Sequence, residues 1–342
     1  MLLTTPAVAL LRASLPDAHL VYVVGPWSAE VARAGPPVDE VRTLAYPGFT
    51  RRPRANILAP YLLLAREAAR LRREGYDLAV VFRPDHWWGA LLSLAAGAPL
   101  RIGGHGAETT PLLTHTSRLA GDEHAAERAL AMAHLALQAV GVPSAQPETR
   151  PIFEVTRAAQ AEAEAFWARH RLDRGTVVAL HPNAGARLKS WPTPNWARLA
   201  DALMARGLGV LLTGAPGDGP LLRSIAALMA RPPELAFGQS LNPSAALYAR
   251  CALVITVDSG AGHLAAAVGT PTVRLYGPAP ANVFGPWPPT ADQHLLVADA
   301  LECVPCGHVE SPPCGAMTEP ACMLALSVEQ VLDRVRAQLP ES

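Results

Sequence analysis

Polar side chains and glycines gather in one short segment of the second half of the chain, directly after an apolar run. The run, 253–257, predicts a buried strand, and a short helix is predicted over 261–268. At this junction lie Asp258, Ser259, Gly260, Gly262 and His263. Free N–H groups at a helix start bind phosphate, and open parallel sheets bind ligands at this edge. Asp258 and Ser259 could also be simple helix caps, but a cap requires neither two glycines nor a histidine, which favours a ligand site.

A single lysine points to the same edge. Of the 29 Lys and Arg residues only Lys189 is a lysine, and a compact ammonium differs from a planar guanidinium in what it can reach. Its loop runs from a strand predicted over 176–181 to a helix predicted over 194–206, and also contains Asn183 and Gly185. We predict that Lys189 contacts a phosphate; a solvated surface lysine is the alternative. The loop is not a P-loop, because the G-x-x-x-x-G-K spacing is absent.

Further polar residues also follow predicted strands. Asp218 comes after the strand 209–213, and it could hold a ribose or cap the next helix. In the first half, Asp85 and His86 follow a strand predicted over 77–82 and are the only acid–base pair visible there. We expect Asp85 and His86 to face an acceptor.

Four of the five cysteines lie near the C-terminal end, in a C-x2-C-x7-C-x7-C pattern formed by Cys303, Cys306, Cys314 and Cys322. Four thiolates at this spacing could hold a structural zinc ion. The second pair lacks the close spacing of common zinc knuckles, so reduced cysteines that pack as small hydrophobic side chains are the alternative. Disulfides are disfavoured in a cytoplasmic chain.

Length and composition define the class of protein. The 342 residues suffice for two domains, 50% of them are hydrophobic, and the formal net charge is +0. A neutral chain without runs of like charge is not a broad nucleic-acid binder and is not strongly attracted to anionic lipid. No apolar run approaches the roughly 18 residues of a membrane-spanning helix, and no signal peptide is visible. We therefore expect a cytoplasmic protein.

The second half alternates between strands and helices. The predicted strands cover 176–181, 209–213, 235–237, 252–257 and 272–276, and the predicted helices cover 194–206, 219–230, 243–249, 261–268 and 327–339. Asn242 is predicted to cap the third of these helices, and Ser327 with Gln330 forms a capping box at the last. This alternation predicts an α/β fold with a doubly wound, Rossmann-like parallel sheet.

The first half follows the same rhythm. Its predicted strands cover 19–24, 39–44 and 77–82, and its predicted helices cover 4–14, 27–33, 57–74, 87–96 and 123–140. A loop rich in proline and polar residues, 141–150, is the predicted linker, which gives domains of residues 1–150 and 151–342. The first half begins with a helix, so we expect its sheet to lack the strand that normally comes first.

These segments resemble glycosyltransferase family 9, the lipopolysaccharide heptosyltransferase family. The resemblance rests on 2–7, on Asp122-Glu123-His124 with Glu127-Arg128, on 181–185, on Lys189 with Trp191-Pro192, on 214–218, and on Asp258-Ser259-Gly260 with His263. It extends over nearly the whole chain and includes the cysteine-rich tail.

The resemblance implies a two-domain GT-B architecture and inversion at the sugar without a metal or other required cofactor. The C-terminal domain would hold a nucleotide-diphosphate sugar, ADP-heptose-like, through Asn183, Gly185, Lys189, Asp218, Asp258, Ser259, Gly260, Gly262 and His263. A lipopolysaccharide-core or other glycan acceptor would lie near Thr4, Thr5, Asp85 and His86. A cytoplasmic enzyme with such an acceptor would act in peripheral contact with the inner membrane face.

Family members carry Gly-Asp directly before the segment that begins here at Leu2, and that Asp resembles a catalytic base. The resemblance therefore implies that the general base and the first strand precede Met1. A nucleotide-sugar epimerase of the same architecture and a truncated, non-catalytic nucleotide-sugar-binding copy are the other functions that we consider. A dinucleotide oxidoreductase is disfavoured, because no G-x-G-x-x-G follows a predicted strand.

Overall fold

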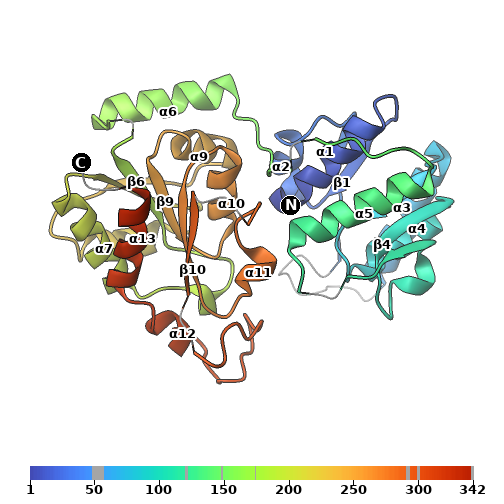
Figure 1. The fold of residues 1–342 in the computed structure, drawn as a ribbon. Helices are drawn as coiled ribbons and strands as arrows, with labels where there is room; N and C mark the ends of the chain where they lie inside the picture. Colours follow the sequence, from blue (N-terminus) through green and yellow to red (C-terminus); the bar gives the residue numbers. More distant parts are fainter. Residues whose placement is uncertain are drawn as a thin grey trace. The chain divides into compact units, whose positions relative to one another are not determined.

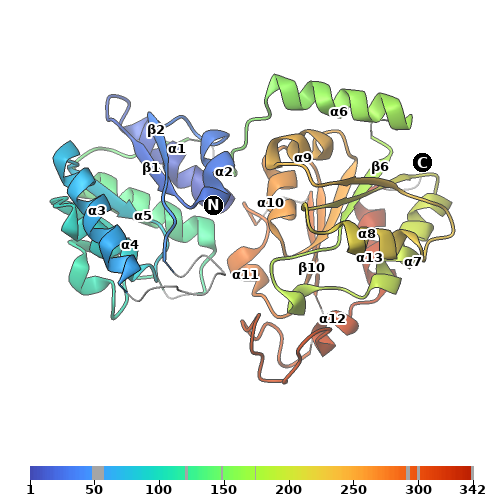
Figure 2. The ribbon, with the colours of Figure 1, turned by 180° about the vertical axis from the view of Figure 1, so that it is seen from behind.

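The computed structural model describes residues 1–47, 58–119, 122–147, 149–173, 175–289, 293–298 and 301–339. The chain divides into two compact units, whose main parts are Leu3–Arg150 and Pro151–Ser342. Each unit is built from parallel strands that alternate with helices (Figures 1 and 2). The predicted α/β fold with parallel sheets is confirmed.

A six-stranded parallel sheet forms the centre of the second unit, in the order β11-β10-β9-β6-β7-β8. Its strands are β6 (Val177–His181), β7 (Gly209–Gly214), β8 (Glu234–Phe237), β9 (Leu253–Val257), β10 (Thr272–Tyr276) and β11 (His294–Ala298). Every residue of β9 and β10 is buried, as expected of apolar strands in a parallel sheet covered on both faces.

Helices cover both faces of this sheet. They are α6 (Arg157–His170), α7 (Thr193–Ala205), α8 (Gly219–Ala226), α9 (Leu241–Tyr248), α10 (Gly260–Ala267), α11 (Ala281–Phe284), α12 (Ala321–Leu324) and α13 (Val328–Gln338), with a 3-10 turn η4 (Arg187–Lys189). On one face, α7, α8 and α13 bury Trp196, Ile225 and Val331 in the main core. On the other face lie α9 and α10 (Figures 1 and 2).

The order of strands reverses between β6 and β9. From β6 the chain continues through β7 to β8 on one side, whereas β9, β10 and β11 lie on the other side. Ligands of doubly wound proteins bind at the carboxyl ends of the strands beside such a reversal, because the loops there leave in opposite directions. The loop after β6 carries Lys189, and Asp258 follows β9 directly.

The prediction for the start of α9 was wrong. The helix begins at Leu241 with Ser240 at its N-cap position, two residues before the predicted cap Asn242. The Asn242 side chain is instead used over a long distance in sequence: its Oδ1 accepts from Thr156 N (2.8 Å), and its Nδ2 donates to Glu154 O (3.3 Å). These bonds hold the segment that leads into α6.

The strands of the first unit form two smaller parallel sheets. One pairs β1 (Val21–Val24) with β2 (Glu40–Thr43), and the other joins β3 (Leu78–Val81), β4 (Leu100–Gly104) and β5 (His115–Ser117). Among the described residues, no strand connects β1 with β3. All four residues of β3 are only half-buried, in contrast to the fully buried β9 and β10.

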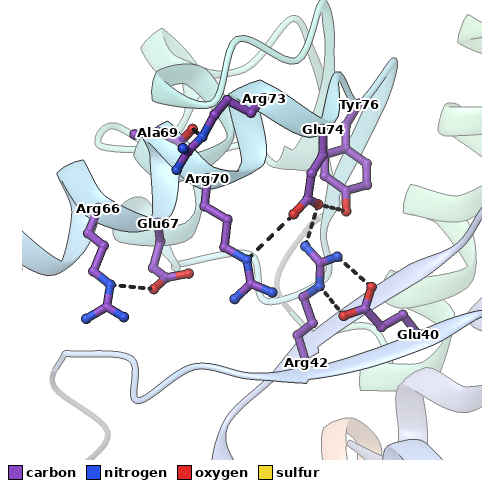
Figure 3. A network of polar contacts seen from close by, with 9 residues as sticks. All are labelled: Glu40, Arg42, Arg66, Glu67, Ala69, Arg70, Arg73, Glu74 and Tyr76. Carbon is purple, nitrogen blue, oxygen red and sulfur yellow. Dashed lines mark hydrogen bonds and ion pairs between the residues drawn. The ribbon is translucent and has the colours of Figure 1, made fainter.

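The helical elements of the first unit are η1 (Leu2–Thr4), α1 (Thr5–Ser14), η2 (Pro26–Ser28), α2 (Ala29–Arg33), α3 (Ala59–Glu74), α4 (Trp87–Ala95), η3 (Thr110–Leu112) and α5 (Ala125–Ala139). Leu10 of α1 and Met132 of α5 pack against Ile102 of β4 in a hydrophobic core of this unit. A charged network joins β2 to the end of α3 (Figure 3): the Arg42 guanidinium contacts both Glu40 and Glu74, and Tyr76 Oη donates to Glu74 Oε2 (2.6 Å). The two carboxylates raise the pKa of Arg42 above its ordinary value.

Several elements were missed by the sequence analysis, namely β4, β5, β11 and α6. The capping box of Ser327 and Gln330 at the start of α13 is present, with both of its hydrogen bonds. The predicted helix 219–230 is shorter than expected, because α8 ends at Ala226.

Candidate functional site

Two residues of the predicted site form an ion pair at the strand reversal. Lys189 Nζ lies 2.5 Å from Asp258 Oδ2, although the residues are separated by 69 positions in sequence. The Asp258 side chain is 7% exposed and that of Lys189 is 21% exposed. Asp258 is therefore a nearly buried carboxylate whose charge is balanced by Lys189, and it does not present a bare negative charge to the edge of the sheet.

The first turn of α10 keeps its N–H groups free of side-chain caps. Ser259 stands at the N-cap position, but its hydroxyl is hydrogen-bonded to Thr256 Oγ1 (2.8 Å), and within the described chain no side chain caps the helix. Gly260 is exposed, and a Cβ there would meet open space. Uncapped N–H groups at a helix start carry a partial positive charge that favours an anion.

Gly262 has a different environment from Gly260. It is buried, and a Cβ at this position would lie 3.0 Å from both Arg274 Nε and Thr256 Cγ2. The glycine therefore lets α10 approach β9 and β10 closely. A side chain at this position would face Arg274 and Thr256, so the contribution predicted for Gly262 in donor binding is that of its backbone.

Arg274, in the middle of β10, was not among the predicted site residues. It is 1% exposed. Its Nη2 donates to Gly262 O (2.8 Å), its Nε to Thr272 Oγ1 (3.1 Å), and its Nη1 lies 3.2 Å from His263 Nδ1. Burial lowers the pKa of Arg274 below its ordinary value, against the effect of Tyr276 and Asp258. The predicted site residue His263 is thus joined to a buried cation.

Asn183 and Asp218 are brought together on the other side of β6. Asn183 Nδ2 donates to Asp218 Oδ1 (2.5 Å), and Ala215 N donates to Asp218 Oδ2 (2.7 Å). Asp218 stands at the start of α8 but makes no capping hydrogen bond, so the simple cap considered for it is wrong. It fixes the loops after β6 and β7 to each other, and Gly185 is exposed in the first of these loops.

A buried polar cluster lies beneath these loops. His181 Nδ1 is 3.1 Å from both Thr213 Oγ1 and Tyr248 Oη, which are 3.1 Å from each other. Burial lowers the pKa of His181 to about 4 and raises the pKa of Tyr248. The ring is therefore neutral near pH 7. His181 was not among the predicted site residues, although it lies at the end of a predicted strand.

The four acceptor-side residues occupy different environments within the first unit. Thr4 Oγ1 bonds to Met1 O (2.7 Å) and Tyr22 Oη (2.8 Å), whereas Thr5 is fully buried. Asp85 accepts two hydrogen bonds from Arg83 (2.7 and 3.0 Å), which lower the pKa of its carboxyl.

His86 does not form a hydrogen-bonded dyad with Asp85. Its ring packs edge-to-face on Tyr46, at 5.0 Å between centroids, and burial lowers its pKa. A lowered pKa makes each of the two groups a weaker base.

The four cysteines of the tail differ in exposure. Cys322 is buried and packs beside Gly277, Cys306 is half-buried, and Cys303 and Cys314 are exposed. Burial raises the pKa of the Cys322 thiol. Within the described parts of the chain, no three His, Cys, Asp or Glu side chains are placed to hold a metal ion. Zinc binding stays a prediction.

The sequence model of glycosyltransferase family 9 (heptosyltransferase) matches residues 64–313. The chain belongs to this family. Its membership confirms the predicted resemblance and the class of enzyme, a glycosyltransferase. None of the helices that the structure describes is long and apolar enough to cross a membrane.

Curated members of family 9 align with much of the chain. Lipooligosaccharide heptosyltransferase 2 of Haemophilus influenzae is 30% identical over 239 residues, 66% of this chain and 66% of that protein. Lipopolysaccharide heptosyltransferase 3 of Escherichia coli is 27% identical over 303 residues, 84% of this chain and 82% of that protein.

Solved structures of family 9 share the fold. The glycosyl transferase family 9 protein from Veillonella parvula superposes with a TM-score of 0.79 at 25% identity, and covers 100% of this chain and 94% of its own. E. coli ADP-heptose lps heptosyltransferase II superposes with a TM-score of 0.75 at 22% identity, over 99% and 95% of the two chains. At this identity the second likeness concerns the fold alone.

Proposed function

We propose that this chain is an inverting, metal-independent heptosyltransferase that takes an ADP-heptose-like donor and transfers its sugar to a lipopolysaccharide-core or other glycan acceptor. The observation that carries the proposal is the Lys189–Asp258 pair at the strand reversal, beside the uncapped start of α10. Support for the sugar and the acceptor comes from the names of the family 9 relatives, and support for the donor from solved structures named as a heptosyltransferase with ADP and with ADP-2-deoxy-2-fluoro heptose.

The donor side has the groups that departure of a nucleoside diphosphate requires. Negative charge grows on the diphosphate as the bond to the sugar breaks, and fixed donors aimed at that charge lower the barrier. In our proposal Lys189 supplies a positive charge, and Gly260 with its neighbours supplies helix N–H groups. Asp258 keeps Lys189 in place and accepts from a sugar hydroxyl. These groups neutralise the leaving group without a metal ion.

Asp218 and Asn183 are proposed to position the nucleoside. Their mutual hydrogen bond fixes two loops at the carboxyl edge of β6 and β7, and the Asp218 carboxylate retains lone pairs that can accept from ribose hydroxyls. Ser259 is proposed to bind phosphate after its hydroxyl turns from Thr256, and His263 to donate to phosphate or sugar.

The acceptor side is proposed to involve the first unit, with Thr4, Asp85 and His86 as candidates. Thr5 is also a candidate, although its side chain is buried at the start of α1. The general base is not assigned to any residue described here, because the hydrogen bonds from Arg83 lower the pKa of Asp85 and make its carboxylate a weak base. A lipid-linked acceptor would bring the protein to the inner face of the membrane as a peripheral enzyme.

Calorimetry with ADP and UDP, followed by transfer assays with ADP-heptose and a lipopolysaccharide-core acceptor, tests the proposal. We expect ADP to bind, and transfer to continue in EDTA. Lys189→Ala should weaken ADP binding by about 2 kcal/mol, as loss of a charged hydrogen bond does, and Lys189→Arg should restore it only in part. Arg187→Ala, in the same 3-10 turn, is the control and should bind normally.

The results that differ from these expectations identify which part of the proposal is wrong. Equal ADP affinity in wild type, Lys189→Ala and Lys189→Arg would remove Lys189 from the site. ADP binding without any transfer would favour a non-catalytic nucleotide-sugar-binding protein, and epimerisation of the donor without acceptor would favour an epimerase.

A further inference from the structure

Arg274 is a charged residue in the middle of the fully buried strand β10. A central position of a buried strand is normally apolar, yet here it holds a guanidinium that is 1% exposed. Arginine keeps its proton in proteins, so a full positive charge lies beneath the first turn of α10. The glycine at position 262 makes room for it, because a Cβ there would lie 3.0 Å from Arg274 Nε.

The charges around Arg274 are not balanced by the described residues. Within the part of the chain that the structure describes, Arg274 forms no ion pair, and the nearby carboxylate of Asp258 is already paired with Lys189. His294 on β11 adds no charge near neutral pH, because burial lowers its pKa to about 4. The phenol of Tyr276 is also neutral, since burial raises its pKa. Two cations, Arg274 and Lys189, therefore lie near one anion, Asp258, at this edge of the sheet.

An unbalanced buried cation is costly unless an anion completes the arrangement. The uncapped N–H groups of α10 attract negative charge to the same place. The excess positive charge is therefore complementary to a dianionic diphosphate, without requiring that Arg274 touch it.

The contact with His263 also fixes the form of that ring. Every N–H of a guanidinium is a donor, so His263 Nδ1, at 3.2 Å, must accept. An imidazolium has no acceptor nitrogen, which excludes the protonated ring from this contact. The proton of the neutral ring must then be on Nε2, which makes Nε2–H the hydrogen-bond donor of His263.

We propose that Arg274 is a positioning residue of the donor site: it holds His263 as the neutral Nε2–H tautomer and places a fixed positive charge behind the N–H groups that receive the diphosphate. This inference rests on the proposed function, because the ligand is the nucleoside diphosphate assigned there. His263 is the residue that contacts the ligand, and Arg274 acts through it and through its charge.

The tautomer can be measured without any ligand. We would record imidazole ¹⁵N spectra of the full chain, with His263→Ala identifying the His263 signals among the 11 histidines. The wild type should show Nδ1 unprotonated and Nε2 protonated. Arg274→Met should show a mixture of both tautomers or a protonated ring, and Arg274→Lys, which retains a donor and the charge, should keep part of the preference.

Calorimetry with ADP on the same proteins measures the consequence. We expect Arg274→Met to weaken ADP binding about tenfold and Arg274→Lys about threefold, and His263→Ala to matter less in the Arg274→Met background than in wild type. Arg250→Met is the matched control, because it removes another largely buried arginine of the same unit and should leave both readouts unchanged. Thermal unfolding of each variant checks that it is folded.

The outcomes separate the two proposals. A His263 tautomer that is identical in wild type, Arg274→Met and Arg274→Lys overturns the positioning role, whatever the affinities. Unchanged ADP affinity in Arg274→Met overturns the electrostatic role. If wild type binds no ADP, the proposed function fails, while the ¹⁵N spectra still decide whether Arg274 fixes His263.

Discussion

Lys189 and Asp258 depend on each other for stability as well as for the proposed binding. Removing Lys189 alone leaves a 7% exposed carboxylate without its cation. We expect Lys189→Met to lower the free energy of unfolding by about 2 kcal/mol, below the usual value for a broken buried pair because Lys189 is partly exposed. Lys189→Met with Asp258→Asn should recover most of this loss in urea titrations but should not recover ADP binding.

The two variants separate stability from binding. Asp258→Asn removes the unpaired charge and should restore stability, but it cannot replace the contact between Lys189 and phosphate. A double variant as unstable as Lys189→Met would show that the ion pair is not the cause. A double variant that binds ADP like wild type would show that Lys189 contributes stability only.

At the scale of residues, the edge of the sheet is predictable because strand ends can be recognised from apolar runs. The contact between Lys189 and Asp258 is not predictable in the same way, since it requires β6 and β9 to be neighbours, and chain order does not give strand order. Arg274 could not be predicted as a site residue for a different reason. One arginine inside the apolar run 272–276 is indistinguishable in sequence from a residue on an exposed strand face.

At the scale of elements, the close approach of α10 to the sheet depends on one glycine and not on the other. The methyl group of Gly262→Ala would lie against Arg274, which is held by three hydrogen bonds. The methyl group of Gly260→Ala would lie in open space. Both changes gain helix propensity. We therefore expect Gly262→Ala to be less stable than Gly260→Ala by about 1–2 kcal/mol, measured by thermal unfolding. Equal stabilities would show that the Arg274 side chain moves aside without loss of folding free energy.

Long, regular elements could be predicted, and short or weakly patterned ones could not. The strands β6, β7, β9 and β10 and the helices between them follow from alternation of apolar runs with helical patterns. The missed β5 has only three residues, His115–Ser117, none of them apolar. The missed α6 is mostly alanine and charged residues, and it buries only three side chains, so its pattern is faint.

At the scale of the whole molecule, the two units differ in how completely their strands are covered. Every residue of β9 and β10 is buried, whereas β3 is half-buried throughout and its sheet is not joined to β1 by any described strand. Strands with fewer partners open at lower free energy. We expect amides of β1 and β3 to exchange with deuterium at least about tenfold faster than those of β9 and β10. Equal protection in both units would contradict this expectation.

The solitary lysine has a practical consequence for chemistry performed on this molecule. Reagents selective for primary amines, such as activated esters, have one side-chain target in all 342 residues. That target is hydrogen-bonded to Asp258 and only 21% exposed, so its acylation reports on a single place in the fold. The α-amine of Met1 is the other primary amine that such reagents reach, so peptide mapping is needed to assign the label; acylation found on the peptide that contains Lys189, and its slowing by a nucleotide, would then probe one pair of atoms.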